Sequence, residues 1–317
     1  MKQFNSLEEI KNIKETVVAL GNFDGVHKGH QELIRRTVKS ARMAGLKSAV
    51  FTFTNHPKNV LAGRHLIKNI LYLEDKAEII RSLGVDYLFS LEFNEIIQHL
   101  TAEEFIEKLL IGAFRMREAY CGFNYRFGYK AEGNPETLIR AGMKAGFGIH
   151  VLEPFIIDGN LVSSSFIRKL IADGRVGECK KYMGRNYCVG GEVVVGNRIG
   201  RTIGFPTSNI LIDETMVTPA HGVYVTYCNY NGICYQGVTN VGIKPTIGDR
   251  KKNIETHIFN FSKEIYGKQI RVEFLERLRP EIKFNSVNEL AQQIEKDCRE
   301  AAHYHQRLNA EHAKKEK

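Results

Sequence analysis

The chain has 317 residues, of which 43% are hydrophobic and 26% charged, and its formal net charge at pH 7 is +9. This composition excludes a disordered or fibrous protein, and the length predicts two domains because one hydrophobic core rarely grows this large. With no apolar run long enough for a membrane span and no export signal, we expect a cytoplasmic protein without a membrane partner. The positive charge favours anionic ligands, whereas the scattered lysines argue against nucleic acid.

Up to Met183, short apolar segments alternate with amphipathic ones, which is typical of a parallel sheet with crossover helices. A capping box formed by Thr101 and Glu104 opens one of the helices. Strands are expected at residues 16–20, 47–53, 85–91, 116–121 and 147–152, and helices at 29–44, 73–83, 135–144 and from Ser164. The sequence therefore predicts a doubly wound α/β domain over residues 1–183.

The first expected strand leads through a glycine-rich turn, GNFDGVHKGH at residues 21–30, into a helix. Backbone N–H groups of such a turn and of the helix start form an anion site, to which we assign Asn22, Phe23, Asp24 and Gly25. His27 and His30 can stabilise the negative charge that an α-phosphate gains as pyrophosphate leaves. The alternative is an ordinary pair of satisfied histidines, but the order of strand, turn and helix favours nucleotidyl transfer.

A second polar segment, VSSSFIRKLIADG at residues 162–174, starts the helix after Ser163, Ser164 and Ser165 and carries Arg168 one turn along. Hydroxyl and N–H groups at a helix start, together with a guanidinium, suit the β- and γ-phosphates of ATP. An N-terminal serine cap with a solvated arginine is the alternative, and the preceding turn motif favours phosphate binding.

Beyond residue 184 the pattern changes to alternating strands separated by Gly, Pro and Asn, at residues 188–195, 222–230, 233–241, 254–261 and 269–275. Such closely spaced strands predict a small β-barrel over residues 184–317. A capping box of Ser286 and Glu289 opens a terminal helix. The predicted fold class is therefore α/β followed by β.

Two segments of the barrel carry candidate chemistry. Glycines at positions 191, 196, 200 and 204 form a flexible collar that suits a nucleotide. Thr207 and Asn209 offer two oxygen ligands for Mg²⁺. Glu255 lies in an alternating apolar segment, where a carboxylate suits a general base. On spacing alone, a glycine-rich hairpin and a salt-bridged glutamate at a barrel rim remain equally good interpretations.

Longer motifs carry a resemblance to a known family. GNFDGVHKGH, FTFTNHPKNV at 51–60, CGFNYRFGYKAEGN at 121–134 and SSSFIR resemble the adenylyltransferase module of the bacterial bifunctional riboflavin kinase/FAD synthetases, within the wider HxGH nucleotidyltransferases. GRTIGFPTSN, HGVYVT, TNVGIKPTIG, ETHIF and RVEFLERLRPEIKF follow in the order of a riboflavin kinase domain. The resemblance covers nearly the whole chain, with Asn55, Asn124 and Asn260 as departures from residues common in the family.

The resemblance implies roles for individual residues. Thr207 and Asn209 lie at the metal and phosphates, and Glu255 is the base acting on the ribityl hydroxyl. Further nucleotide contacts in the barrel are Gly196, Gly200, Arg201 and Gly204. The residues implied in flavin binding are His56, Pro57, Asn124, Phe127 and Arg279.

The implied function is a two-step synthesis of flavin cofactors, with riboflavin, FMN and ATP as small-molecule partners, ATP as co-substrate and Mg²⁺ as cofactor. The barrel phosphorylates riboflavin to FMN, and the N-terminal domain joins FMN to AMP, which gives FAD and pyrophosphate. Three alternatives remain: one active site only, a non-catalytic regulator that binds flavin or RNA, and a nucleotidyltransferase for another phosphorylated substrate. The sequence also leaves open a homo-oligomer.

Overall fold

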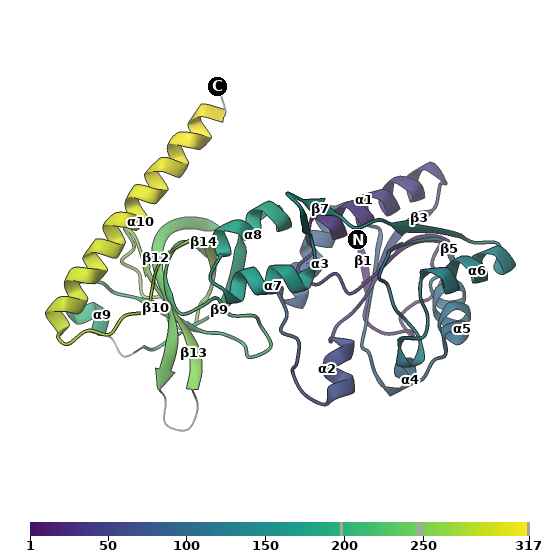
Figure 1. The fold of residues 1–317 in the computed structure, drawn as a ribbon, viewed down its shortest axis with the longest axis horizontal. Helices are drawn as coiled ribbons and strands as arrows, with labels where there is room; N and C mark the ends of the chain where they lie inside the picture. Colours follow the sequence, from purple (N-terminus) through teal and green to yellow (C-terminus); the bar gives the residue numbers. More distant parts are fainter. Residues whose placement is uncertain (197–198, 246–249, 316–317) are drawn as a thin grey trace. The chain divides into compact units, whose positions relative to one another are not determined.

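A computed structural model describes residues 1–196, 199–245 and 250–315 (Figure 1). These residues form two compact units, Met1–Phe166 and Ile167–Lys317. Within the described ranges, the helices are all too short or too polar to traverse a lipid bilayer.

The first unit is built on a six-stranded parallel sheet, which confirms the predicted doubly wound domain. Its strands lie in the order β1-β4-β3-β2-β5-β6. From β2 the chain moves outward to β3 and β4 on one side, and then to β5 and β6 on the other. The carboxyl ends of β2 and β5 therefore flank the point where the strand order reverses, which is the usual ligand-binding crevice of such sheets. The strands are β1 (Lys2–Phe4), β2 (Thr16–Leu20), β3 (Lys47–Phe53), β4 (Tyr87–Leu91), β5 (Met116–Gly122) and β6 (Gly148–Leu152).

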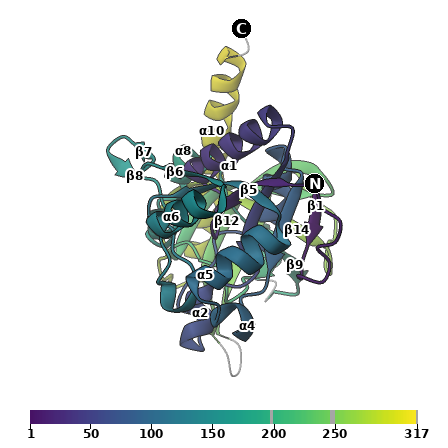
Figure 2. The same cartoon turned by 90° about the vertical axis from the view of Figure 1, so that its right-hand side faces the viewer.

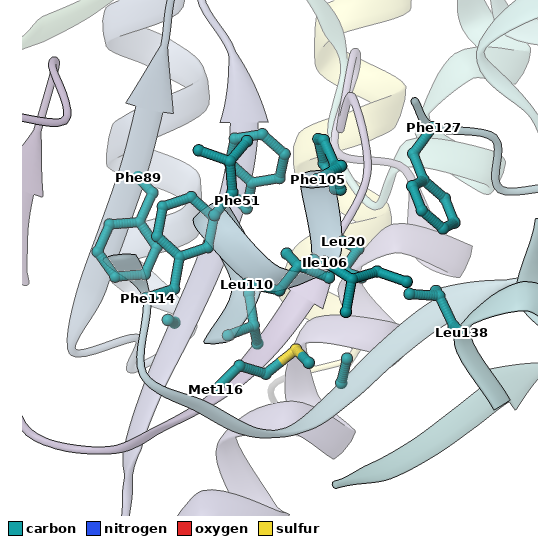
Figure 3. Packing of buried hydrophobic residues seen from close by; sticks show 14 of the residues in the cluster. Leu20, Phe51, Phe89, Phe105, Ile106, Leu110, Phe114, Met116, Phe127 and Leu138 are labelled. Atoms are coloured by element: carbon teal, nitrogen blue, oxygen red, sulfur yellow. The ribbon is translucent and has the colours of Figure 1, made fainter. Parts of the chain in front are cut away.

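Helices cover the sheet because its strands carry apolar side chains on both faces. On one face, α1 (Lys28–Met43) and α3 (Leu73–Ser82) pack in a cluster with strand residues such as Ala19 and Val50. The other face packs against the π-helix η1 (Phe105–Ala113) and α6 (Pro135–Ala145), where the rings of Phe89 and Phe114 stack with centroids 4.2 Å apart (Figure 3). The two faces therefore have separate cores.

The expected capping box of Thr101 and Glu104 is present and opens α5 (Ala102–Glu104), which continues into η1. Several short elements connect the larger ones, and the β7–β8 hairpin can be followed in Figure 2. These connecting elements are α2 (Pro57–Ala62), α4 (Glu95–Gln98), η2 (Tyr129–Ala131), β7 (Ile156–Ile157) and β8 (Asn160–Leu161).

The second unit contains a closed antiparallel barrel in the order β10-β13-β12-β11-β14-β9, which confirms the predicted small barrel. Its elements are α8 (Val176–Met183), β9 (Tyr187–Val194), α9 (Ile199–Thr202), β10 (Ser208–Leu211), β11 (Gly222–Tyr230), β12 (Ile233–Pro245), β13 (Arg250–Ile258), β14 (Gln269–Pro280) and α10 (Val287–Lys315). The helix α7 (Ser164–Ala172) begins at the end of the first unit and continues into the second. Because α8 packs on β14 and β9, this compact unit begins before Met183. The boundary that we predict between the functional domains, near Met183, therefore lies inside it.

The barrel interior carries a row of three buried threonine hydroxyls. Thr226 Oγ1 lies 2.7 Å from Thr239 Oγ1, which lies 2.9 Å from Thr256 Oγ1. Ile254 and Ile258 flank Thr256 on the buried face of β13, whereas Glu255 is only half-buried. Glu255 therefore lies on the face of β13 opposite to that of Thr256, as the alternation of a strand requires.

The terminal helix α10 packs on the barrel through apolar and charged contacts. Ala301 joins a cluster with Val225, Val238 and Leu275. Asp297 accepts two hydrogen bonds from the guanidinium of Arg279, at 2.9 and 2.7 Å. At the start of the helix, Ser286 Oγ accepts a hydrogen bond from the backbone N–H of Glu289, as a capping box requires. The Glu289 carboxylate, however, accepts from Asn285 N rather than from Ser286 N.

Candidate active sites

The first candidate site is the turn that follows β2. Phe23 and Val26 are fully buried and adopt positive φ angles of 47° and 31°, which cost about 1–3 kcal/mol each in non-glycine residues. Gly25 has φ 78°, and a Cβ there would lie 3.0 Å from the side chain of Ile70. The turn therefore needs glycine at position 25, and core packing holds it in a strained conformation. Strain of this kind is common at ligand-binding turns.

The two predicted histidines lie together where this turn enters α1. His27 is the N-terminal cap of the helix, and its Nδ1 accepts a hydrogen bond from His30 N at 3.2 Å. Its neutral ring therefore carries the hydrogen on Nε2. The two imidazoles stack with centroids 3.5 Å apart and an interplanar angle of 17°. A Cβ at Gly29 would lie 3.3 Å from His27 Nδ1, so glycine leaves room for this arrangement. The structure thus brings His27 and His30 to the positive end of a helix dipole.

The serine segment is tied to the same turn. Ser164 Oγ donates a hydrogen bond to the backbone oxygen of Asp24 at 2.8 Å, and Asp24 Oδ1 accepts one from Ile70 N at 2.9 Å. Ser163 Oγ accepts from Phe166 N at 3.2 Å, which caps the start of α7. The structure therefore brings part of the predicted phosphate site together within the first unit. Ser165 is exposed at the same helix start.

Arg168 follows Ser164 by one turn of α7, but it belongs to the second compact unit. Its side chain is half-buried. The phosphate contact of Arg168 therefore stays a prediction.

A buried lysine that we did not predict lies beneath the turn. Lys76 Nζ is 3.4 Å from Asn22 O, 3.3 Å from Thr52 Oγ1 and 3.2 Å from Phe53 O. Burial lowers the pKa of Lys76 to about 8, while the charge of Asp24 acts in the opposite direction. The ammonium thus links the carboxyl ends of β2 and β3 close to the predicted phosphate site. In the sequence, Lys76 looks like any lysine on an amphipathic helix.

The residues predicted to line the flavin pocket have mixed environments. His56 caps α2, with Nδ1 accepting from Lys58 N at 3.2 Å, and Pro57 is the first residue of that helix. Asn124 is exposed, whereas Phe127 is buried in the core next to Phe105, with ring centroids 5.2 Å apart. The flavin contacts of these four residues stay predictions.

Two of the departures from the family pattern have a structural basis. Asn55 exchanges two hydrogen bonds with the backbone of Phe93, at 2.8 and 3.2 Å, so it fixes the loop in front of His56. Asn260 has φ 54°, a conformation that asparagine tolerates better than most residues. Both asparagines therefore have local roles in the backbone. Arg279 lies in the second unit, where it forms the ion pair with Asp297 described above.

The second candidate site lies where β10 pairs with β13. In this antiparallel ladder Asn209 is directly opposite Glu255, and Thr207 precedes β10 by one residue. Asn209 is 4% exposed, and its Nδ2 is 3.4 Å from Thr207 Oγ1. Register therefore brings together the three residues that we assign to the metal and to the base, although Glu255 is far from the other two in sequence.

The glycine collar supports this site structurally. A Cβ at Gly196 would lie 2.5 Å from Asn209 Nδ2, and one at Gly200 would collide with Phe205 O. Gly204 has φ 88°. Each of these positions therefore needs glycine for close approach or backbone conformation, and their nucleotide contacts stay predictions. The predicted role of Arg201 concerns a side chain outside the described part of the structure.

One residue of this site was missed. Asn253 is buried, and its Nδ2 donates to Asn209 Oδ1 at 2.9 Å and to Glu255 Oε1 at 2.8 Å. The available signal was its spacing, because residues two apart in a strand share a face. The hydroxyl of Thr207 and the amide oxygen of Asn209 are hard oxygen donors, which fit Mg²⁺. Elsewhere in the described residues, no three His, Cys, Asp or Glu side chains come close enough to form a metal site.

These features define a class of protein. A glycine-rich turn with HxGH at the switch point of a parallel sheet is typical of nucleotidyltransferases, and the barrel adds a site with the oxygen ligands and the carboxylate of a phosphotransferase. The sequence profile of the family described as FAD synthetase matches residues 9–166, and that described as riboflavin kinase matches residues 183–305.

Curated relatives have both modules in one chain. A bifunctional riboflavin kinase/FMN adenylyltransferase of Bacillus subtilis is 37% identical over 93% of this chain and 94% of its own length. The protein of the same name from Escherichia coli K12 is 33% identical over 89% of this chain and 90% of its own. The chain belongs to the bifunctional riboflavin kinase/FMN adenylyltransferase family.

A solved structure has the same fold. A Streptococcus pneumoniae protein, titled a macrolide-efflux protein, is 34% identical, covers 93% of this chain and 96% of its own, and has a TM-score of 0.85. The transport role in that description concerns the Streptococcus pneumoniae protein alone. The match shows that the order of the two modules and their folds also occur together in a solved structure.

Proposed function

We propose that this chain makes FAD from riboflavin in two ATP-dependent steps, one in each module. The observation that carries the proposal is the pair of assembled sites: stacked His27 and His30 at the switch point of the sheet, and Asn209 opposite Glu255 in the barrel. Residues 1–183 form the adenylyltransferase domain and residues 184–317 the kinase domain. The substrates are small molecules rather than nucleic acid, and the enzyme works in the cytoplasm.

In the barrel, Glu255 accepts the proton of the terminal ribityl hydroxyl of riboflavin. The hydroxyl oxygen then attacks the γ-phosphorus of ATP, and the bond to the ADP oxygen breaks. Mg²⁺ held by Thr207 and Asn209 would neutralise charge on the phosphates. Gly196, Gly200, Arg201 and Gly204 contact the nucleotide, and Arg279 contacts the flavin.

In the N-terminal domain, a phosphate oxygen of FMN attacks the α-phosphorus of a second ATP, and pyrophosphate leaves. His27 and His30 donate hydrogen bonds to the phosphate oxygens as negative charge grows on them. Residues 22–25, Ser163, Ser164, Ser165 and Arg168 hold the phosphates. His56, Pro57, Asn124 and Phe127 bind the isoalloxazine ring.

Product analysis by chromatography tests this proposal. The purified chain, incubated with riboflavin, ATP and Mg²⁺, should produce FMN and then FAD. A His27→Ala variant should stop at FMN, with adenylyl transfer reduced by about 100-fold or more. A Glu255→Ala variant should lose the kinase step, typically by about 100-fold or more, but should still convert supplied FMN into FAD. Absence of both products from the unaltered chain would refute the proposal, and loss of both steps in either variant would refute the assignment of one step to each module.

A further inference from the structure

Asn253 lies between Asn209, the predicted metal ligand, and Glu255, the predicted base of the kinase site. It is only 3% exposed, although asparagine is a polar residue, and its Nδ2 lies 2.9 Å from Asn209 Oδ1 and 2.8 Å from Glu255 Oε1 (β10 and β13 in Figure 1). Both distances are those of good hydrogen bonds. One side chain therefore links the predicted metal ligand with the predicted base.

The chemistry of the three groups fixes their orientation. An ionised carboxylate only accepts hydrogen bonds, so the N–H side of the Asn253 amide must face Glu255. The second hydrogen on the same nitrogen then points to Asn209 and selects an oxygen there as its acceptor. The nitrogen of the Asn209 amide is left on the side of Thr207, 3.4 Å from its Oγ1.

This arrangement has a cost that packing alone does not explain. Among the described residues, the buried Oδ1 of Asn253 has no hydrogen-bond partner. An unsatisfied buried acceptor is destabilising, and an apolar side chain of the same size would avoid that penalty. The two hydrogen bonds from Nδ2 are the feature that an apolar replacement could not provide.

We propose that Asn253 is a positioning residue of the kinase step: it holds the Glu255 carboxylate in place and fixes the amide of Asn209 with its oxygen towards Asn253 and its nitrogen towards Thr207. This inference rests on the proposed riboflavin kinase function. It assigns to Asn253 an effect on turnover, exerted through its two neighbours rather than by contact with the reacting atoms.

The test compares Asn253→Asp with Asn253→Ala. Aspartate keeps the shape of the side chain, but an ionised aspartate offers only acceptors, so it repels Glu255 and favours the nitrogen of Asn209 in place of its oxygen. Alanine removes both hydrogen bonds without adding a charge. We expect the kinase kcat to fall by about 100-fold or more in Asn253→Asp and by about 10-fold in Asn253→Ala, within the range of general-base effects. The KM for riboflavin should change by less than about 3-fold, because neither variant alters a group that contacts the substrate.

Two controls accompany these variants. Conversion of supplied FMN into FAD by the same variant reports on the N-terminal domain and should be unchanged, while thermal unfolding reports whether the barrel is folded. Asn229→Asp makes the same chemical change on β11 opposite Cys234, close to the hairpin, and should leave kinase turnover at the wild-type rate. A purely structural role predicts that the kinase rate falls only as far as the folded fraction of the barrel falls in thermal unfolding, because a cavity and an unpaired buried aspartate are both destabilising.

The possible results separate the inference from the proposed function. If the unaltered chain makes FMN and both Asn253 variants keep kcat within about 2-fold, the inference is wrong and the proposed function stands. If Asn253→Asp does not fold, Asn253→Ala alone tests the inference, which is wrong if its kcat stays within about 2-fold of the unaltered chain. If the unaltered chain makes no FMN, the proposed function falls and this inference falls with it.

Discussion

Lys76 is a buried cation whose surroundings compensate for only part of the cost of its desolvation. Three oxygens lie within 3.2 to 3.4 Å of its Nζ, and they belong to the ends of two neighbouring strands. Thr52 Oγ1 also donates to Asn22 O at 2.9 Å, so the lysine joins an existing link between β2 and β3. Lys76 therefore stabilises the turn of the predicted phosphate site through these oxygens, without itself being assigned a contact with substrate.

This burial should be visible in the pH dependence of stability. The pKa of Lys76 is lowered from 10.5 to about 8 in the folded chain, so the unfolded chain binds more protons between these two values. Stability from this group therefore rises as the pH increases from about 8 towards 10.5, by at most about 1.4 kcal/mol per pH unit. Lys76→Met should lack this component. Urea unfolding of both proteins at about pH 7.5 and about pH 9.5 measures the change in the free energy of unfolding. An equal change in the two proteins would contradict the prediction.

At the scale of single residues, the sequence predicted groups that sit in local motifs. His27 and His30 were identified because three consecutive elements supply their environment, and Thr207 and Asn209 because an extended segment places them on one face. Asn253 and Lys76 were not identified, because their roles depend on partners 44 and 54 residues away, Asn209 and Asn22. Hydrogen bonds between distant segments follow from strand register, which periodicity does not determine.

At the scale of elements, long periodic segments were predicted well and short ones were missed. The bounds of β2, β3 and β11 agree with expectation, because each is a strong apolar or alternating run. The four-residue strand β10 was not expected, since its pattern is shorter than the window in which alternation is recognisable. β13 ends at Ile258, three residues before its predicted end, and the positive φ of Asn260 follows soon after.

The contact of α10 with the barrel should be sensitive to acid. His305 on this helix is fully buried, with its ring 5.0 Å from that of Tyr227, and burial lowers its pKa. The unfolded chain therefore takes up a proton near the ordinary histidine pKa of 6.5 that the folded chain resists, and stability is lost as the pH falls below that value. In scanning calorimetry, His305→Phe should narrow the difference in melting temperature of the barrel between about pH 7.5 and about pH 5.5. An equal difference in both proteins would refute this role.

At the scale of the whole molecule, each compact unit has its own hydrophobic cluster and its own candidate site. Length and the change in hydrophobic period predicted this division in two. The end of the first compact unit, at Phe166, could not be predicted, because α8 packs on barrel strands that come later in the chain. The sequence pattern indicates whether a segment is a helix or a strand. It does not indicate which distant strands that segment packs against.

The proposed assignment of one step to each module implies that the two steps can be divided between molecules. An equimolar mixture of His27→Ala and Glu255→Ala chains should convert riboflavin into FAD, since the first makes FMN and the second adenylylates it. We expect a lag while free FMN accumulates, and the lag should shorten when FMN is added. Chromatography of timed samples measures this. A mixture that makes FMN but never FAD would contradict the assignment of one step to each module.

The line of threonine hydroxyls inside the barrel is held together by its middle member. Each hydroxyl supplies one hydrogen, so Thr239 can donate to only one of its neighbours, Thr226 or Thr256, and must accept from the other. Changing Thr239 alone to valine would leave both outer hydroxyls without this hydrogen-bond partner, which costs about 1–3 kcal/mol of stability each. Changing all three threonines to valine should cost less stability, because no hydroxyl is then left unpaired. In thermal unfolding, the triple variant should therefore have a higher melting temperature than the single variant, although it has lost more hydroxyl groups.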